Sequence, residues 1–368
     1  AFLTRLKTRG LINDEDIQKI KDTRELQVGK EIIKFPSDAK TLVQAFKDGE
    51  IQVGDYLNYN DYVDETKTCT TATNENGWAD QKYTATKNTY WQVLGLDETG
   101  ERLMLISQSP IKKEMKTSDT AEEWEKTPYL VLKGAYGYVN CKQILNNVSG
   151  IYSTSLGKAE SLTAEEINRL IGVTVDYTNK KVYANSDLNT NIDKWGVLGN
   201  QYTYKETDYT PESYINSKAN ATAGTQTDPA TAYWYQWGNL KIEDTLKTIL
   251  FNGTTSDANF AKSYWLASPA VFADSGRAGF GPGGVCDGSV IAGFGLFASH
   301  GYWLADSFGV RPVVYLESNV TIEDLHKIDG QEEDWSAYSN RDSKVAHGNS
   351  SNGEAGNHGT ESGGGGPV

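Results

Sequence analysis

Residues 263–316 join two short, β-prone ends through a middle of unusual composition. The ends, at 264–266 and 310–316, are rich in aromatic and branched apolar residues, which favour strands. Between Ala270 and Ser307 the chain holds no Lys, Glu, Gln, Asn, Thr or Met, although most of these are frequent elsewhere. A Gly-rich, chemically mixed segment between rigid ends is typical of a binding surface carried on a scaffold. From composition alone, an all-β region whose glycines mark turns and bulges is an equal alternative.

Two short sequences at these ends carry a family resemblance. Tyr-Trp-Leu-Ala-Ser-Pro at 264–269, followed by Phe-Gly-Val-Arg-Pro-Val-Val at 308–314, resembles the C-terminal domain of the variable proteins of diversity-generating retroelements. The resemblance covers residues 129–318 and, more loosely, 51–110. It implies a C-type-lectin-like fold in its formylglycine-generating-enzyme-like form, on bacterial surfaces, pilin-like proteins or phage tails.

The same resemblance implies a restricted set of residues in the middle segment. In that family, mutagenic copying rewrites Asn-type codons (AAC or AAT), which cannot become codons for Lys, Glu, Gln, Met or Trp. Residues 270–307 fit this alphabet except at Trp303, which is then a fixed position. The expected function is a diversified ligand-binding protein of receptor or adhesin type, whose partner is a protein or surface ligand.

The resemblance and the residue types together select the expected site. Trp265 is expected to pack in the core, and Arg311 to be held by buried hydrogen bonds near the last strands, so both are scaffold. Aromatic and aliphatic residues would supply contact area, and charged residues would set polarity. Strand register decides which residues face outward. The expected ligand-binding residues are Arg277, Phe280, Cys286, Asp287, Ser289, Ile291, Phe294, Phe297, Ser299, His300, Tyr302, Leu304 and Asp306.

The chain as a whole is expected to be an α+β protein in several parts. Residues 1–50 form an N-terminal helical attachment segment, and 51–128 a small β-rich module. Residues 129–330 form the C-type-lectin-like domain, with an insert at 183–262 rich in Asn, Thr and Tyr. Residues 331–368 are rich in Gly, Ser and Asn and are expected to be a disordered tail.

Several local elements follow from pattern. Asn13 before three acidic residues predicts a helix start, and Thr163 with Glu166 forms a capping box for a helix that ends at Gly172. Residues 90–96 and 102–107 predict a hairpin. Residues 60–89, rich in Thr, Asn and Asp, predict a long exposed loop, and 112–127 a charged, solvated stretch with Trp124 anchored to the body.

Charge and cysteine content exclude several classes. The net charge of −14 argues against nucleic-acid or anionic-membrane binding, which needs clustered Lys and Arg. Three widely spaced cysteines allow at most one disulfide and match no zinc motif. No apolar run reaches the ~18 residues of a membrane span. We expect an extracellular, cell-surface or virion location, no cofactor and no metal; oligomerisation is left open.

Some catalytic motifs match in sequence but lack the context that their chemistry requires. Gly279–Gly284 matches GxGxxG, but Pro282 interrupts it and no helix pattern follows, as a dinucleotide site requires. Asp274-Ser275-Gly276 lacks a positioned base. Formylglycine-generating enzymes use two active-site cysteines, whereas Cys286 stands alone in this region. We therefore expect no enzyme, and the main alternative function is an invariant structural subunit of a phage tail, pilus or surface layer.

Overall fold

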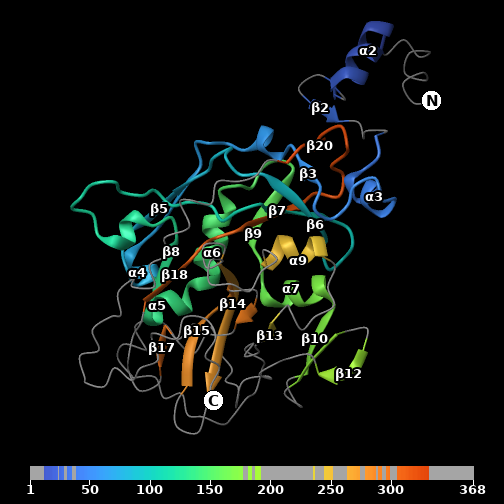
Figure 1. Cartoon of the computed structure of the whole chain (residues 1–368). Coiled ribbons are helices and arrows are strands. Elements are labelled where there is room, and N and C mark those ends of the chain that lie inside the picture. The colour runs from blue at the N-terminus through green and yellow to red at the C-terminus, as the bar shows by residue number, and fades with distance from the viewer. Residues whose placement is uncertain are drawn as a thin grey trace.

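A computed structural model shows a mixed α+β protein whose strand pairs are antiparallel (Figure 1). It describes residues 12–23, 25–28, 31–34, 39–176, 181–184, 187–191, 235–236, 244–251, 263–273, 278–286, 289–291, 296–298 and 305–330. The predicted tail after residue 330 lies outside these residues. The C-type-lectin-like form of the fold remains an expectation.

A six-stranded sheet forms the centre of the described structure. In spatial order its strands are β20 (Lys327–Ile328), β3 (Tyr56–Leu57), β6 (Trp91–Leu96), β7 (Leu103–Ser107), β19 (Pro312–Leu316) and β9 (Gly157–Ser161). Three of these strands come from residues 51–128 and three from residues 129–330. The predicted β-rich module and the predicted ligand-binding domain therefore contribute to the same sheet.

A second sheet carries most of the unusual segment. Its strands are β13 (Tyr235–Gln236), β16 (Ser289–Ile291), β15 (Ala278–Cys286) and β14 (Tyr264–Ala273), with β17 (Phe297–Ala298) also paired to β15. The smaller sheets are β1 (Glu25–Val28) with β2 (Glu31–Lys34), β4 (Thr68–Thr71) with β5 (Gln81–Thr84), β8 (Leu130–Lys133) with β18 (Ala305–Phe308), and β10 (Val173–Asp176) with β11 (Lys181–Ala184) and β12 (Asp187–Asn191).

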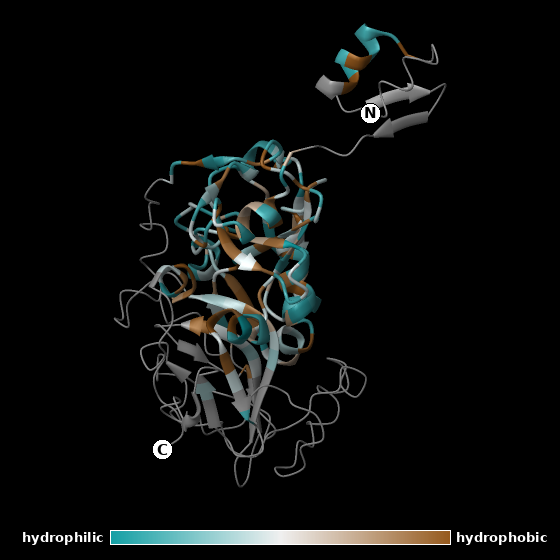
Figure 2. Ribbon diagram, turned by 90° about the vertical axis from the view of Figure 1, so that its right-hand side faces the viewer, coloured by the Kyte–Doolittle hydropathy of each residue, from teal (hydrophilic) through white to brown (hydrophobic). Residues whose placement is uncertain are grey.

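The helices cover these sheets or extend from them. They are α2 (Asp14–Thr23), α3 (Leu42–Lys47), α4 (Thr73–Asn76), α5 (Gly134–Val139), α6 (Cys141–Gly150), α7 (Ala164–Ile171) and α9 (Asp244–Phe251), with 3-10 turns η1 (Tyr59–Tyr62) and η2 (Glu123–Lys126). In Figures 1 and 2, α2 stands apart from the elements that follow residue 39. No helix in the described ranges is long and apolar enough to cross a membrane.

The central sheet is buried on both faces. Along β7, Leu103 and Leu105 belong to the core cluster that includes α3, α5 and α6, while Met104 and Ile106 belong to the cluster that includes α7 and α9. All four are fully buried. Figure 2 shows the apolar strands at the centre and hydrophilic residues around them. This two-sided burial explains why β7 is a continuous apolar run rather than an alternating one.

The capping signals are confirmed. Asn13 Oδ1 accepts a hydrogen bond from the Asp16 N–H at 2.7 Å, at the start of α2. Thr163 and Glu166 form the expected capping box on α7, and Gly172 ends that helix with φ of 68°. A left-handed residue at this position favours glycine, which has no Cβ to clash.

The prediction of a long exposed loop at 60–89 is wrong. This stretch holds β4, α4 and β5, and the Tyr83 side chain is fully buried in the core. The buried Asn76 side chain donates to the carbonyls of Thr71 and Ala79 and accepts from the N–H groups of Trp78 and Ala79. The Asn76 side chain thus satisfies backbone groups that would otherwise need backbone partners, and composition alone does not predict such a contact.

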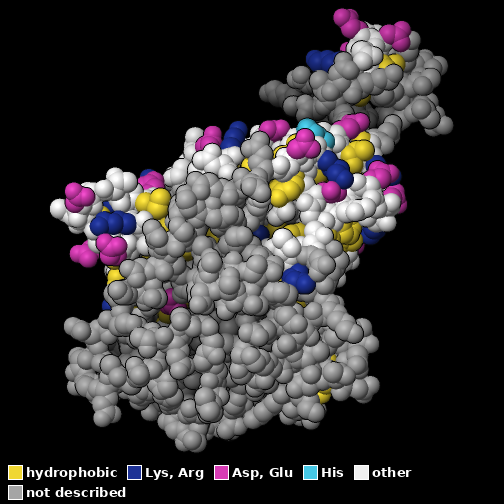
Figure 3. All heavy atoms as spheres, in the orientation of Figure 1, with side chains coloured by type: hydrophobic (Ala, Val, Ile, Leu, Met, Phe, Trp, Pro, Cys, Tyr) yellow, Lys and Arg dark blue, Asp and Glu magenta, His cyan; other side chains and the backbone are white. Residues whose placement is uncertain are grey.

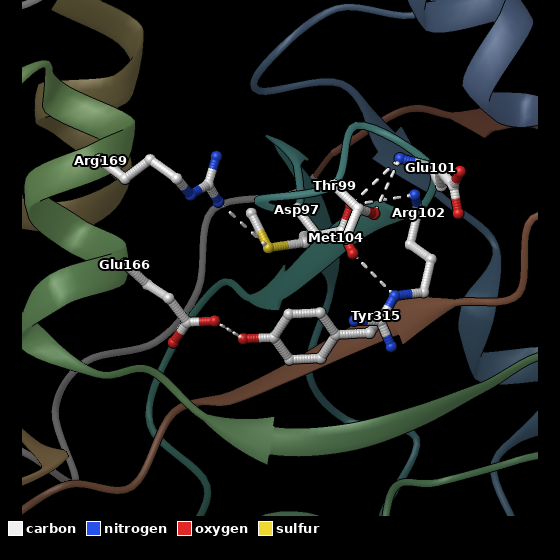
Figure 4. Close-up of polar contacts among 8 residues, drawn as sticks. All are labelled: Asp97, Thr99, Glu101, Arg102, Met104, Glu166, Arg169 and Tyr315. Carbon is white, nitrogen blue, oxygen red and sulfur yellow. Dashed lines mark hydrogen bonds and ion pairs between the residues drawn. The ribbon is translucent and has the colours of Figure 1, made fainter.

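The β6–β7 hairpin is confirmed, and a buried carboxylate closes its turn. Asp97 is 4% exposed; it accepts hydrogen bonds from Arg102 Nε at 2.8 Å, from Thr99 Oγ1 at 2.8 Å and from the backbone N–H groups of Glu101 and Arg102. Burial alone would raise the pKa of Asp97, but these hydrogen bonds outweigh it and lower the pKa to about 2. Figure 4 shows Arg102 and Thr99 directed at Asp97.

Figure 4 also shows how α7 is fastened to the sheet beside this turn. The Tyr315 hydroxyl on β19 donates to Glu166 Oε1, whose Oε2 accepts from the Thr163 N–H at 2.8 Å. Burial raises the pKa of Tyr315, and the adjacent Glu166 carboxylate raises it further. The Arg102 guanidinium lies 5.2 Å from the centre of the Tyr315 ring. These groups have structural roles, because each takes part in a helix cap, a turn or a helix–strand contact.

Replacing Asp97 by Ala is expected to lower the free energy of unfolding by about 2–3 kcal/mol, because four donors lose their acceptor. In the wild type, the stabilisation by Asp97 is present above its ordinary pKa of 3.8 and is lost as pH falls towards about 2. Urea unfolding at pH 7 and pH 2.5 measures both effects. The exposed neighbour Glu101, replaced by Ala, is the control and should change stability by less than about 0.5 kcal/mol. Equal losses for the two variants would contradict this account.

Candidate ligand-binding site

The two ends of the unusual segment are fixed to each other. The Trp265 N–H donates to the Gly309 carbonyl at 2.9 Å, and the Gly309 N–H donates to the Ser263 carbonyl at 3.0 Å. Ser263 and Gly309 are both buried. A Cβ at position 309 would lie 2.4 Å from Pro110 Cβ and 3.0 Å from the Ser263 carbonyl oxygen. Only glycine permits this close approach of the chain.

Trp265 lies in the core at this junction. It is 1% exposed, and its indole N–H donates to the Leu130 carbonyl at 3.0 Å. Its ring meets the Phe308 ring edge-on, with centroids 4.5 Å apart. The side chain therefore links the start of β14 to both β8 and β18.

Arg311 is also buried at this junction, at 2% exposed. Its guanidinium donates to the carbonyls of Ser107, at 2.7 and 3.1 Å, of Ile249, at 2.7 Å, and of Gln108, at 3.2 Å. It also lies 5.0 Å from the centre of the Tyr264 ring. Burial raises the pKa of Tyr264 to about 12 despite the opposing positive charge. Arg311 thus joins the ends of β7 and α9 to the strand that follows the segment.

The predicted contact residues in strands lie on one face of the second sheet. Phe280 of β15 pairs with Phe297 of β17, and Cys286 pairs with Ser289 of β16. Ile291 pairs with β15 two residues before Cys286. Directly opposite residues share a face, and so do residues two apart in a strand. The register therefore places all five on the same face.

The opposite face of this sheet packs into the core cluster of α7 and α9. Val285 pairs with Tyr264, and both are 2% exposed or less. Because Val285 adjoins Cys286 in the strand, it lies on the other face from the predicted contact residues. Trp265 shares the face of those residues but at the base of the hairpin, where the first core cluster covers it.

The GxGxxG match lies inside β15, and the next described element is the strand β16. Pro282 pairs with Pro269 at a register shift of the β14–β15 hairpin. Along the other edge of β15, β17 pairs at 279–280 and β16 at 284–286. Pro282 falls in the gap between them, where a missing N–H removes no ladder bond. The motif is therefore part of a hairpin and not of a phosphate-binding loop.

Of the remaining predicted residues, the structure describes only Asp306. Asp306 lies in β18, where it pairs with Leu132 of β8; it is half-buried, and its Oδ1 accepts from the Ser307 N–H at 2.7 Å. The others lie outside the described residues. These are Arg277, Asp287, Phe294, Ser299, His300, Tyr302 and Leu304.

Other kinds of site are not evident in the part of the chain that the structure describes. It holds no group of three His, Cys, Asp or Glu side chains placed to bind a metal ion. Figure 3 shows acidic and basic side chains interspersed on the described part of one face, without a large area of one sign. The burial of Lys113 was not predicted from the sequence. The available signal was its position two residues after Ile111, because Ile111 and Lys113 are buried while Lys112 is exposed.

Comparison with known proteins adds no relative. No protein-family model, no curated protein sequence and no solved structure matches the chain. The candidate site therefore depends on the residues and the register described above.

Replacing Gly309 by Ala is expected to lower the free energy of unfolding by more than about 2 kcal/mol, because the added methyl group overlaps Pro110. The matched control is Gly150→Ala at the end of α6, where a Cβ meets no atom within 4 Å. Alanine there should be neutral or stabilising by up to about 1 kcal/mol. Thermal unfolding of the two variants measures the difference. Similar midpoints would show that the chain does not pass as closely at Gly309 as described.

Proposed function

We propose that this chain is a ligand-binding protein in which residues 270–307 form the contact surface on a C-type-lectin-like scaffold. The observation that carries the proposal is the common face of Phe280, Cys286, Ser289, Ile291 and Phe297. A loop-rich segment that serves only as a connection has no need to collect mixed residue types on one face.

The fixed base of the hairpin supports the same function. Trp265, Gly309 and Arg311 hold the ends of the segment through buried hydrogen bonds and ring contacts. A rigid base separates the stability of the fold from the identity of the residues beyond it. Such a separation is what a surface needs if it is to vary without unfolding the protein.

The restricted alphabet of residues 270–307 is the third support. It matches the products of Asn-type codon rewriting, with Trp303 as the exception. We propose, accordingly, that the segment is diversified as in the variable proteins of diversity-generating retroelements. The partner is then a protein or surface ligand met at a cell surface, outside the cell or on a virion.

Sequencing this locus and its flanks across many sibling isolates tests the diversification. We expect differences confined to Asn-type codons within 270–307, while the codons of Trp265, Gly309 and Arg311 stay constant. A nearby reverse transcriptase and a near-repeat of the segment should accompany them. An unchanging segment without such a repeat would contradict diversification and favour an invariant structural subunit of a tail, pilus or surface layer.

The two faces of the sheet predict different responses to truncation. Val285→Ala is expected to lower the free energy of unfolding by about 2 kcal/mol, because it removes two methyl groups from the core. Phe280→Ala is expected to change it by less than about 0.5 kcal/mol, since a contact residue is not part of the core. Denaturant unfolding of both variants measures this. A loss of several kcal/mol for Phe280→Ala would place it in the core and remove it from the proposed surface.

A further inference from the structure

Lys113 is a buried lysine in a loop whose other lysines are exposed to a much greater extent. It is 3% exposed, whereas the side chain of Lys116 is 66% exposed and that of Lys126 is 37% exposed. The loop, residues 113–127, is closed by the Lys113 N–H, which donates to the Pro128 carbonyl at 3.2 Å, and by the Lys116 N–H, which donates to the Glu125 carbonyl at 2.8 Å. The amine of Lys113 is therefore enclosed when the loop is closed.

The enclosed amine holds the far side of the loop. Lys113 Nζ donates to the Trp124 carbonyl at 2.6 Å and lies 4.9 Å from the centre of the Trp124 ring. The Trp124 ring meets the Trp78 ring edge-on at 6.0 Å, and both pack against Val131 and Ala305. Contact between Lys113 and Trp124 thus keeps the loop on the β8–β18 strand pair.

No carboxylate of the described residues forms an ion pair with Lys113, although glutamates are close in sequence. Each of three glutamates of the loop forms an ion pair with another lysine. These pairs are Lys82–Glu114 at 2.6 Å, Lys126–Glu123 at 3.1 Å and Lys116–Glu125. Within the described residues, none forms an ion pair with Lys113. A buried ammonium without a counter-charge costs free energy, whereas a buried neutral amine does not carry that cost.

The ionisable groups around Lys113 come from three elements. Glu125 of η2 is the charged group that acts on it most directly. Tyr83 of β5 is its partner in an isolated antiparallel bridge, and its neighbour Lys82 pairs with Glu114. Lys133 of β8 lies beyond the Trp pair, 5.0 Å from the centre of the Trp78 ring. Glu125 raises the pKa of Lys113, but the opposing effect of burial is larger.

We propose that protonation of Lys113 controls closure of the 113–127 loop: the neutral amine stabilises the closed loop and the ammonium form opens it. The proposal goes beyond ligand binding and does not depend on it. It makes the loop a pH-sensitive cover over Trp78, beside the strand through which residues 270–307 rejoin the scaffold at Ala305.

The direction of the pH dependence follows from the two states. Burial lowers the pKa of Lys113 from 10.5 to about 7 in the closed loop, although Glu125 acts in the opposite direction. In the open loop the amine is solvated and keeps its ordinary pKa. Between pH 7 and 10.5 the open loop therefore binds more protons, and closure strengthens by up to about tenfold per pH unit. Below pH 7 both states are protonated and closure no longer depends on pH.

Hydrogen exchange of the loop amides, chiefly the Lys116 N–H, tests this in the full chain. Rates measured from pH 6 to pH 9 are divided by the intrinsic rate of an unprotected amide at the same pH. We expect protection that is constant from pH 6 to 7 and then rises by up to about tenfold per unit towards pH 9. Lys113→Met, which is neutral at every pH, should abolish the rise. Lys112→Met, the same change at the exposed neighbour, should leave it intact.

Protection without pH dependence in the wild type, or the same rise in Lys113→Met, would overturn the proposal. A second measurement covers the case in which Lys113→Met fails to fold. In wild-type protein labelled with carbon-13 at lysine Cε, one lysine signal should titrate near pH 7. If every lysine signal titrates above about pH 9.5, Lys113 keeps an ordinary pKa and the proposal fails.

Discussion

The structure around the unusual segment depends on the mutual hydrogen bonds of Gly309 with Ser263 and Trp265. They join two positions more than 40 residues apart, so the intervening chain forms one closed unit. Closing a long loop costs entropy that grows only slowly with its length. The ends of the segment are therefore held by Ser263, Trp265 and Gly309 themselves.

The rest of the core is built around this junction. Arg311 ties it to the ends of β7 and α9, and Trp265 ties it to β8 and β18. The central sheet, buried on both faces, supplies the fixed strands to which these groups attach. Residues 51–128 and 129–330 contribute strands to one sheet. The reason is that β3, β6 and β7 cannot bury both of their faces without helices from the later part of the chain.

Local sequence signals predicted the elements that local physics decides. The α7 capping box needs only Thr163 and Glu166, three residues apart, and the β6–β7 hairpin needs only two apolar runs and a polar turn. The prediction of an exposed loop at 60–89 failed because the order of this region depends on distant residues. Tyr83 is buried in the common core, and the Gln81 side chain hydrogen-bonds to the backbone of Val131. Polar composition indicates a loop only when no other element covers the polar groups.

For the candidate site, residue type was readable from the sequence but register was not. Phe280 and Phe297 could be chosen as contact residues, yet only strand pairing shows that they lie opposite each other. Asp306 fits by type and still belongs to a different strand pair. Lys113 shows the same limit for charge. In a stretch rich in Lys and Glu, Lys112 is exposed, whereas the next residue, Lys113, is buried like Ile111. Composition describes the stretch as a whole, whereas the chemistry of a single amine depends on which side of the chain faces the core.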